Sequence, residues 1–136
     1  MQFNKNRRLA LIHQALAAIA LVATGLPVQA QNWPERPIKL VVPYPAGGNA
    51  DNTARLLATQ LSARLGQQVV VDNRPGGSGT IGAAAVAKAA PDGYTLLLDA
   101  TAFTVNPSLF AKLPFDAAKD FAPISLVGTT PCALVI

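Results

Sequence analysis

The sequence predicts an α/β fold with a mostly parallel sheet and flanking helices. Short runs of β-type apolar residues alternate with helix-length segments between residues 38 and 127. The run Val69-Val70-Val71 is apolar throughout, as expected for a strand that is buried on both faces of a parallel sheet. Because right-handed crossovers join such strands, the helices are expected to pack against the sheet.

The first 30 residues are typical of a signal peptide. Three basic residues precede an apolar run that covers most of residues 9–26, and small residues lead up to Ala30. A transmembrane anchor fits less well, because His13 and Gln14 interrupt the apolar run. We therefore expect export to the periplasm, with cleavage after Ala30.

Without this leader the chain has almost no net charge. Three of the eleven Lys and Arg residues lie in the leader, so eight basic residues remain against seven acidic ones. No basic run interleaved with aromatic residues remains, and we expect no nucleic-acid partner. The single histidine, His13, belongs to the leader, which removes histidine-based catalysis and metal binding. We expect no catalytic residue, no metal and no cofactor.

The leading candidate for a site is the segment that follows the first predicted strand, which covers residues 38–42. Pro43 and Pro45 in this segment end strand pairing, because proline cannot donate to a ladder. Gly47 and Gly48 allow positive φ and a close approach of the backbone to a ligand. Asn49 and Asp51 are residue types that cap helices, and a helix pattern follows them.

Free N–H groups at the start of a helix, next to the carboxyl end of a strand, form an anion site. We therefore expect this loop to hold a small carboxylate. The alternative is that Gly47-Gly48 serves only as a turn. Asp51 also has two interpretations: it anchors water at the site, or it stabilises the helix start and pairs with Arg55.

A helix is predicted over residues 50–65, followed by a second strand over residues 68–72. Gly66 stands where a left-handed residue ends a helix. The predicted helix carries one apolar stripe at helical spacing, formed by Ala54, Leu57, Ala58, Leu61 and Leu65. This stripe is expected to cover one face of the sheet.

The rest of the chain continues the alternation. A glycine-rich loop opens a helix over residues 83–89. Arg74 in this loop is expected to pair with Asp72 or brace the loop, and direct contact with a carboxylate is the alternative. The later predicted elements are a third strand at 94–98, a helical turn at 106–110 capped by Asn106, a fourth strand at 122–127 and a fifth at 131–136. The apolar run at the end suggests a fragment of a longer protein.

Three loops lie at the carboxyl ends of predicted strands, where open α/β sheets bind ligands. They cover residues 43–51, 74–80 and 99–106. All three are rich in small, polar or proline residues, and none carries a nucleophile beside a base.

A competing motif lies in the second of these loops. The segment Gly77-Ser78-Gly79-Thr80-Ile81-Gly82 matches G-x-G-x-x-G, and Asp99 ends the next strand. Four residues separate this motif from its strand, however, and that strand is the second and not the first. An exported protein also meets little soluble NAD. A dinucleotide-binding enzyme domain is therefore kept as the alternative to carboxylate binding.

An ordered series of motifs covers essentially all of residues 33–136. Its pieces are Tyr44-Pro45-Ala46-Gly47-Gly48 with Asp51, Asn73-Arg74-Pro75-Gly76, Pro91-Asp92-Gly93-Tyr94-Thr95-Leu96, Asn106-Pro107-Ser108-Leu109 and Leu113-Pro114-Phe115-Asp116. In this series the chain closely resembles the substrate-binding receptors of tripartite tricarboxylate transporters, the Bug-type periplasmic receptors.

The resemblance implies a two-lobed fold of the type II periplasmic-binding-protein kind, whose cleft closes on a small carboxylic acid. Residues 31–136 would supply part of the first lobe, and the second lobe would be missing. It further implies a monomeric receptor that delivers its ligand to the membrane subunits of a tripartite transporter.

The resemblance also implies two groups of ligand-binding residues, acting through backbone groups and ordered waters. The loop after the first strand contributes Pro45, Ala46, Gly47, Gly48 and Asp51, and the loop after the third strand contributes Ala100, Thr101 and Ala102. Many members have Gly-Thr-Ser-like residues where this chain has Asp99-Ala100-Thr101-Ala102.

Overall fold

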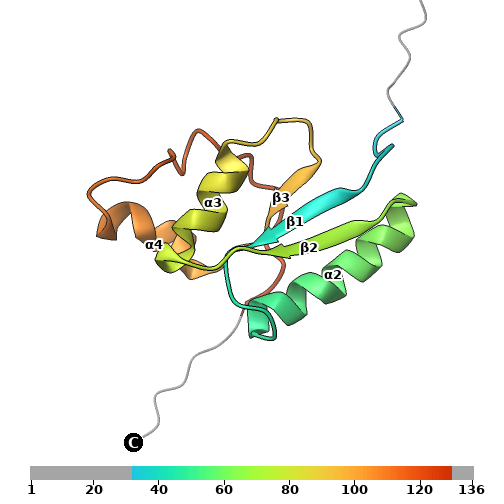
Figure 1. Ribbon diagram of the computed structural model, residues 1–136, viewed down its shortest axis with the longest axis horizontal. Coiled ribbons are helices and arrows are strands. Elements are labelled where there is room, and N and C mark those ends of the chain that lie inside the picture. The colour runs from blue at the N-terminus through green and yellow to red at the C-terminus, as the bar shows by residue number, and fades with distance from the viewer. Residues whose placement is uncertain (1–31, 130–136) are drawn as a thin grey trace, which may run out of the picture. The chain divides into compact units, whose positions relative to one another are not determined.

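The computed structural model describes residues 32–129, and the unit considered below begins at Pro34. Its elements follow in the order β1 (Ile38–Val42), α2 (Asn49–Leu65), β2 (Val69–Asn73), the short 3-10 turn η1 (Gly77–Gly79), α3 (Thr80–Ala87), β3 (Thr95–Leu97) and α4 (Thr101–Leu109) (Figure 1). The predicted α/β class is confirmed. In the described part of the chain, no helix combines the length and the apolar character that a membrane span needs.

The three strands form a parallel sheet in the order β2-β1-β3. Leu40 at the centre of β1 pairs with Val71 on one side and with Leu96 on the other. Four of the five β1 residues are buried, and the exception is Lys39. The central strand is therefore covered on both faces, as its apolar sequence predicts.

The two crossovers place helices on opposite faces of the sheet. The chain moves from β1 to β2 in one direction and from β2 to β3 in the other, so right-handed connections put α2 and α3 on different sides. Figure 1 shows this arrangement, with α2 on one side of the strands and α3 with α4 on the other. Because the strands are parallel, all three end at the same edge of the sheet, and the candidate loops emerge from this edge.

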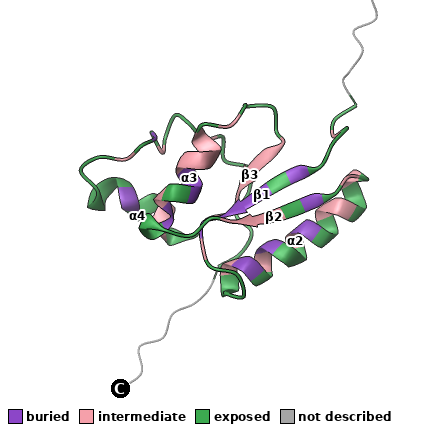
Figure 2. Cartoon of the chain, viewed as in Figure 1, coloured by how far each residue is buried: buried purple, intermediate pink, exposed green. Residues whose placement is uncertain are grey.

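The predicted apolar stripe of α2 covers one face of the sheet. Ala54 and Ala58 are buried against β1, and Figure 2 shows buried residues along this helix. The longer side chains of Leu57, Leu61 and Leu65 are partly buried against the same core. At the end of the helix Gly66 has φ 67° and donates its N–H to the Ser62 carbonyl, which confirms the predicted cap.

The opposite face of β1 packs closely against α3. A Cβ on Gly82 would lie 2.8 Å from the Pro43 Cβ and 3.1 Å from the Arg74 carbonyl oxygen. Gly82 therefore lets the helix approach the strand end more closely than any other residue would. The neighbouring Ala83 is buried in the same contact.

The structure corrects the prediction for residues 99–110. Residues 101–109 form α4, so the helix starts five residues before the predicted turn and Asn106 lies inside it. Asn106 is buried and caps nothing with its side chain: its Nδ2 donates to the Ser78 carbonyl at 2.8 Å. The sequence predicts a local cap at Asn106, whereas its side chain binds a loop 28 residues away.

The predicted fourth strand at 122–127 is wrong for the described structure. This segment has no regular secondary structure, and Ile124 and Leu126 are about four-fifths exposed. An apolar run becomes a strand only where a neighbouring strand accepts and donates hydrogen bonds, and no strand within residues 32–129 pairs with it. The predicted fifth strand at 131–136 and the predicted leader lie outside the described residues.

We expect the β1 core to carry much of the stability of this unit. Ile38 is fully buried, so Ile38→Ala should lower the free energy of unfolding by about 2–5 kcal/mol. Leu56 on α2 is 72% exposed, so Leu56→Ala should change the free energy of unfolding by less than about 0.5 kcal/mol. Urea unfolding of both variants measures the difference, and equal losses would contradict the assignment of the core.

Candidate ligand site

The loop between β1 and α2 is exposed at the carboxyl edge of the sheet. Residues 45–49 are all exposed, whereas Pro43 before them and Asp51 after them are buried. Gly47 has φ 83°, as predicted for a glycine in a tight loop. Gly48 has φ −79° and ψ 173°, so it is extended and stands at the N-cap position of α2.

Asp51 connects this loop to the rest of the fold. Its Oδ2 accepts hydrogen bonds from the Gly47 N–H at 2.8 Å and from the Arg55 Nε at 2.9 Å. Its Oδ1 accepts from the Asn73 Nδ2 at 3.0 Å, and the same amide also donates to the Tyr44 carbonyl at 3.1 Å. The carboxylate therefore joins the loop, the first turn of α2 and the end of β2.

This geometry tests the helix-capping predictions for Asn49 and Asp51. Neither side chain caps α2 at its N-cap position, which Gly48 occupies without a side-chain hydrogen bond. Asp51 instead reaches backwards to the Gly47 N–H, outside the helix, and the predicted pairing with Arg55 is confirmed. The predicted pair between Arg74 and Asp72 is also confirmed, at 2.9 Å.

Several N–H groups at the start of α2 remain unused by the described residues. No acceptor within residues 32–129 takes a hydrogen bond from the N–H groups of Asn49, Ala50 or Asp51, whereas the Gly48 N–H closes a turn on the Pro45 carbonyl. The first bond of the helix is donated by the Asn52 N–H to the Gly48 carbonyl. These N–H groups carry the positive end of a 17-residue helix, which favours an anion there.

The loop between β3 and α4 has the same construction. The Asp99 Oδ1 accepts from the Ala100 N–H at 2.7 Å, and α4 begins at the next residue, Thr101. No described residue accepts from the N–H groups of Thr101 or Ala102. In each loop one acid thus satisfies a backbone N–H just before the helix and leaves N–H groups of the first turn open.

A hydrogen bond ties the two loops together. The Tyr44 hydroxyl donates to the Asp99 Oδ1 at 2.8 Å, across 55 residues of sequence. Residue 44 follows β1 and residue 99 follows β3, so the contact spans neighbouring strands of the sheet. It brings the two predicted groups of ligand-binding residues to one region.

The acids in these two loops have different electrostatic surroundings. The hydrogen bonds from Arg55 and from the Gly47 N–H lower the pKa of Asp51 to about 2. Burial raises the pKa of Asp99, against the opposing effect of the bonds from Ala100 and Tyr44. Burial and the neighbouring Asp99 raise the pKa of the Tyr44 hydroxyl to about 12. Tyr44 is therefore a neutral donor at physiological pH.

The predicted site residues contribute unequally. Pro45 has no N–H and can offer only its carbonyl, and the N–H groups of Gly47 and Ala100 are already taken by acids. Sequence reasoning missed Tyr44, Asn73 and Asp99 as supports of the two loops. Their position at the carboxyl ends of three adjacent strands was the signal that could have found them.

The glycine-rich loop of the competing motif is explained by packing. Gly77 and Gly79 have positive φ, and Gly82 makes the close contact with Pro43. Asp99, which the dinucleotide hypothesis assigns to a ribose, has one oxygen occupied by Tyr44 and Ala100. The glycine pattern thus has a structural cause in this fold.

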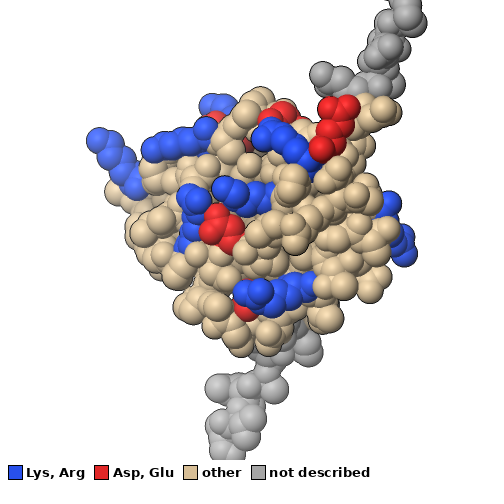
Figure 3. Space-filling model, turned by 45° about the vertical axis from the view of Figure 1, so that its right-hand side comes forward, with Lys and Arg blue, Asp and Glu red and all other residues tan. Residues whose placement is uncertain are grey.

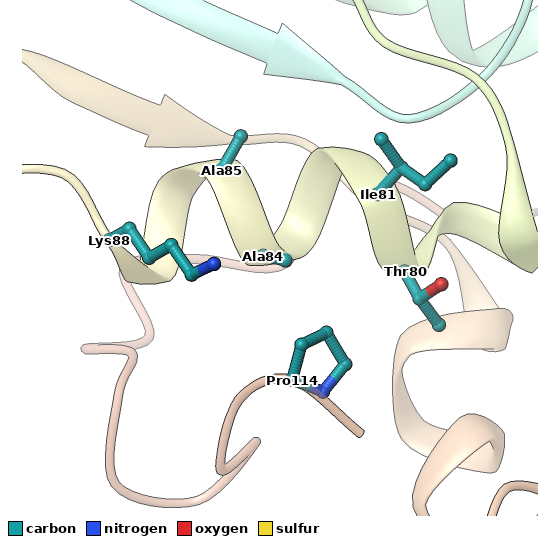
Figure 4. A pocket seen from close by; sticks show the side chains of 6 residues that line it. All are labelled: Thr80, Ile81, Ala84, Ala85, Lys88 and Pro114. Carbon is teal, nitrogen blue, oxygen red and sulfur yellow. The ribbon is translucent and has the colours of Figure 1, made fainter. Parts of the chain in front are cut away.

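Two shallow hollows lie on the surfaces of α2 and α3. One follows the outer side of α2 and is lined by Asn52, Arg55, Leu56 and Thr59. The other lies between α3 and the segment that carries Pro114, with Ile81 and Lys88 on its helical side (Figure 4). Neither is lined by a predicted ligand-binding residue. Residues 45–49 are exposed, so the first candidate loop lies open at the edge of the sheet.

Charged side chains do not gather on the visible face of the molecule. In Figure 3 the Lys and Arg side chains are scattered, and acidic side chains lie beside some of them. Ion pairs in the described part of the chain include Arg36 with Asp92 at 2.7 Å and Lys119 with Asp116 at 3.1 Å.

The parallel sheet with its candidate loops at one edge matches part of the solved periplasmic binding proteins. The solved structure of the periplasmic binding protein BugD matches 68% of this chain and 31% of its own chain, with a TM-score of 0.66 and 47% identity. The structure of MatC from Rhodopseudomonas palustris with bound malate matches 70% of this chain and 33% of its own, with a TM-score of 0.64 and 39% identity.

The family model of the tripartite tricarboxylate transporter family receptor (TctC) matches residues 53–136. The chain belongs to this family of periplasmic solute-binding receptors, which confirms the resemblance drawn from the sequence. Protein BugT of Bordetella pertussis is 45% identical over 134 residues, and a UPF0065 protein of Bordetella bronchiseptica is 48% identical over 128 residues. These alignments cover 97% and 93% of this chain, but the chain spans only 40% and 38% of the two relatives.

We expect the stabilising effect of Asp51 to depend on pH. Its pKa is lower in the fold than in the unfolded chain, so its contribution is present above about pH 4 and is lost as the pH falls towards 2. Asp51→Asn should therefore lower the unfolding temperature by several degrees at neutral pH and by much less near pH 2.5. Thermal unfolding monitored by circular dichroism measures both values.

The matched control is Asp92→Asn, which breaks the exposed ion pair with Arg36 and should change the unfolding temperature little at either pH. The raised pKa of Asp99 acts with the opposite sign, because protonation favours its folded environment as the pH falls. A pH-independent deficit of the Asp51 variant would contradict the assigned role.

We expect Gly82→Ala to destabilise the unit although alanine favours a helix. The added Cβ meets backbone and ring atoms that cannot move aside, at a cost of about 1–3 kcal/mol against a helix gain of about 1 kcal/mol. At Gly128 a Cβ meets nothing within 4 Å, so Gly128→Ala is the control. Urea unfolding that shows Gly82→Ala to be the more stable of the two would refute the close contact.

Proposed function

We propose that this chain forms most of the first lobe of a periplasmic receptor that captures a small carboxylic acid for a tripartite transporter. The second lobe lies outside this sequence, in keeping with the 40% of BugT that the chain spans. The receptor has no catalytic residue and no cofactor, acts as a monomer, and passes its ligand to membrane subunits.

One observation carries this proposal: the unused N–H groups of residues 49–51 at the carboxyl edge of the sheet. Such groups bind anions through hydrogen bonds and through the dipole of the helix behind them. The N–H groups of Thr101 and Ala102 lie on the other side of the bond between Tyr44 and Asp99 and offer a second set of donors. A carboxylate between the two loops would be held by donors from both helices.

The negative charge of Asp51 does not oppose this binding mode. Its two oxygens are engaged by the Gly47 N–H, Arg55 and the Asn73 amide, and the Arg55 guanidinium compensates its charge. The acid therefore holds the loop in shape and leaves the N–H groups of the first helical turn without an acceptor. Binding of malate by MatC, a family structure with the same fold, supports a carboxylic acid as the ligand.

The leader supports the location. A basic start, an apolar run and small residues before Ala30 are the features of an exported precursor, and the family is periplasmic. We propose cleavage after Ala30. Mass spectrometry of the secreted protein would then find a chain that begins at Gln31.

The dinucleotide alternative is not favoured by any geometric observation. Its glycines have structural causes, and Asp99 is bound to Tyr44. A thermal-shift comparison of small organic acids with NAD and NADH on the two-lobed receptor separates the functions. Stabilisation by the dinucleotides alone would favour a dinucleotide-binding enzyme domain over a carboxylate receptor.

We expect Asn49→Pro to weaken carboxylate binding about tenfold or more, because proline removes one open N–H and thus one charge-assisted hydrogen bond. Proline suits the first position of a helix, and the extended Gly48 before it is compatible with proline. The unfolding temperature should therefore stay the same or rise slightly. Isothermal titration of the two-lobed receptor with malate and succinate measures the loss.

Asn49→Ala is the matched control, since it removes the same side chain but keeps the N–H group. Its affinity should stay within about threefold of the wild type. Equal affinities of the proline and alanine variants would show that the N–H groups at the start of α2 do not hold the ligand.

A further inference from the structure

Asp99 is a partly buried acid of the described structure that has no cationic partner. Four of the other acids lie within 4 Å of a Lys or Arg nitrogen: Asp51, Asp72, Asp92 and Asp116. Two further acids, Glu35 and Asp120, also have no cation within this distance, but both are exposed to solvent. Within residues 32–129, Asp99 is thus the one partly buried acid without a Lys or Arg at ion-pair distance.

One oxygen of Asp99 is occupied and the other is open. The Oδ1 accepts from the Tyr44 hydroxyl and from the Ala100 N–H. No described residue donates to the Oδ2. This oxygen lies beside the glycine-rich loop, because a Cβ on Gly79 would be 3.6 Å from it. Asp99 therefore stands where all three loops at the carboxyl edge meet.

A partly buried carboxylate without a cation costs free energy, and burial indeed raises the pKa of Asp99. Two neutral or backbone donors compensate it only in part. A group in this condition at a binding edge favours a ligand that brings a donor or a positive charge. The same group repels a second carboxylate that approaches without one.

We propose that Asp99 selects the class of acid bound here: carboxylic acids with a hydroxyl or ammonium donor beside the carboxylate, in preference to plain carboxylic acids. This inference rests on the proposed function. The ligand carboxylate takes the open N–H groups of α2 and α4, and its donor takes the Asp99 Oδ2. Hydroxy acids and amino acids share this chemistry, and the test distinguishes them.

Tyr44 and Asp99 have separable parts in this arrangement. Asp99→Asn keeps an oxygen that accepts from Tyr44 and Ala100, but it removes the charge and replaces the open oxygen with a donor. Tyr44→Phe keeps the charge of Asp99 and removes the bond between the loops. The first change should alter which acid is preferred, and the second should alter the affinity for all acids alike.

The experiment uses three acids with one carbon skeleton: succinate, malate, which adds a hydroxyl, and aspartate, which adds an ammonium group. Isothermal titration of the wild-type two-lobed receptor should show malate or aspartate binding at least tenfold more tightly than succinate. Asp99→Asn should reduce that preference about tenfold or more, and Tyr44→Phe should leave it within about threefold.

The results distinguish a failure of the role proposed for Asp99 from a failure of the proposed receptor function. Wild-type affinity for succinate equal to that for malate and aspartate overturns the role of Asp99 but leaves a carboxylate receptor, and this comparison needs no folded variant. A preference that Asp99→Asn leaves unchanged overturns it as well. If none of a wider panel of organic acids binds the wild type, the proposed function itself fails.

Discussion

The candidate site depends on the way Asp51 is held. A buried carboxylate needs hydrogen bonds and a compensating charge, and this one receives them from the Gly47 N–H, Arg55 and Asn73. Each partner comes from a different part of the chain: the loop, the helix and the end of the neighbouring strand. The same contacts that satisfy the acid therefore fix the loop on the sheet and set the direction in which α2 begins.

The loop after β3 also holds an acid through a backbone N–H, but the charge of this acid is not compensated by a cation. Asp99 also accepts a backbone N–H just before a helix, but its second partner is the neutral hydroxyl of Tyr44 and not an arginine. Asp51 is consequently a compensated structural acid, whereas Asp99 keeps an uncompensated charge at the edge of the sheet. Two acids with similar local contacts thus have different consequences for a ligand, because only one has a cation beside it.

Local sequence patterns were sufficient to predict those features whose contacts lie within a single helix or strand. The β1 strand, the apolar stripe of α2 and the Gly66 cap were all predictable, since strand runs, helical spacing and a left-handed glycine act within a few residues. The pair of Asp51 with Arg55 was predictable for the same reason. Prediction failed for Asn106 and for residues 122–127, where the outcome depends on a distant carbonyl or on a partner strand.

The candidate site shows the same division. The sequence by itself determined the α/β class, the family and the loops that carry small residues at strand ends, because these follow from short-range patterns in order along the chain. Only the tertiary structure decided which N–H groups stay open and which are taken by Asp51 and Asp99. The reason is physical: a hydrogen bond such as that between Tyr44 and Asp99 joins residues 55 positions apart, and the parallel sheet alone brings them within reach.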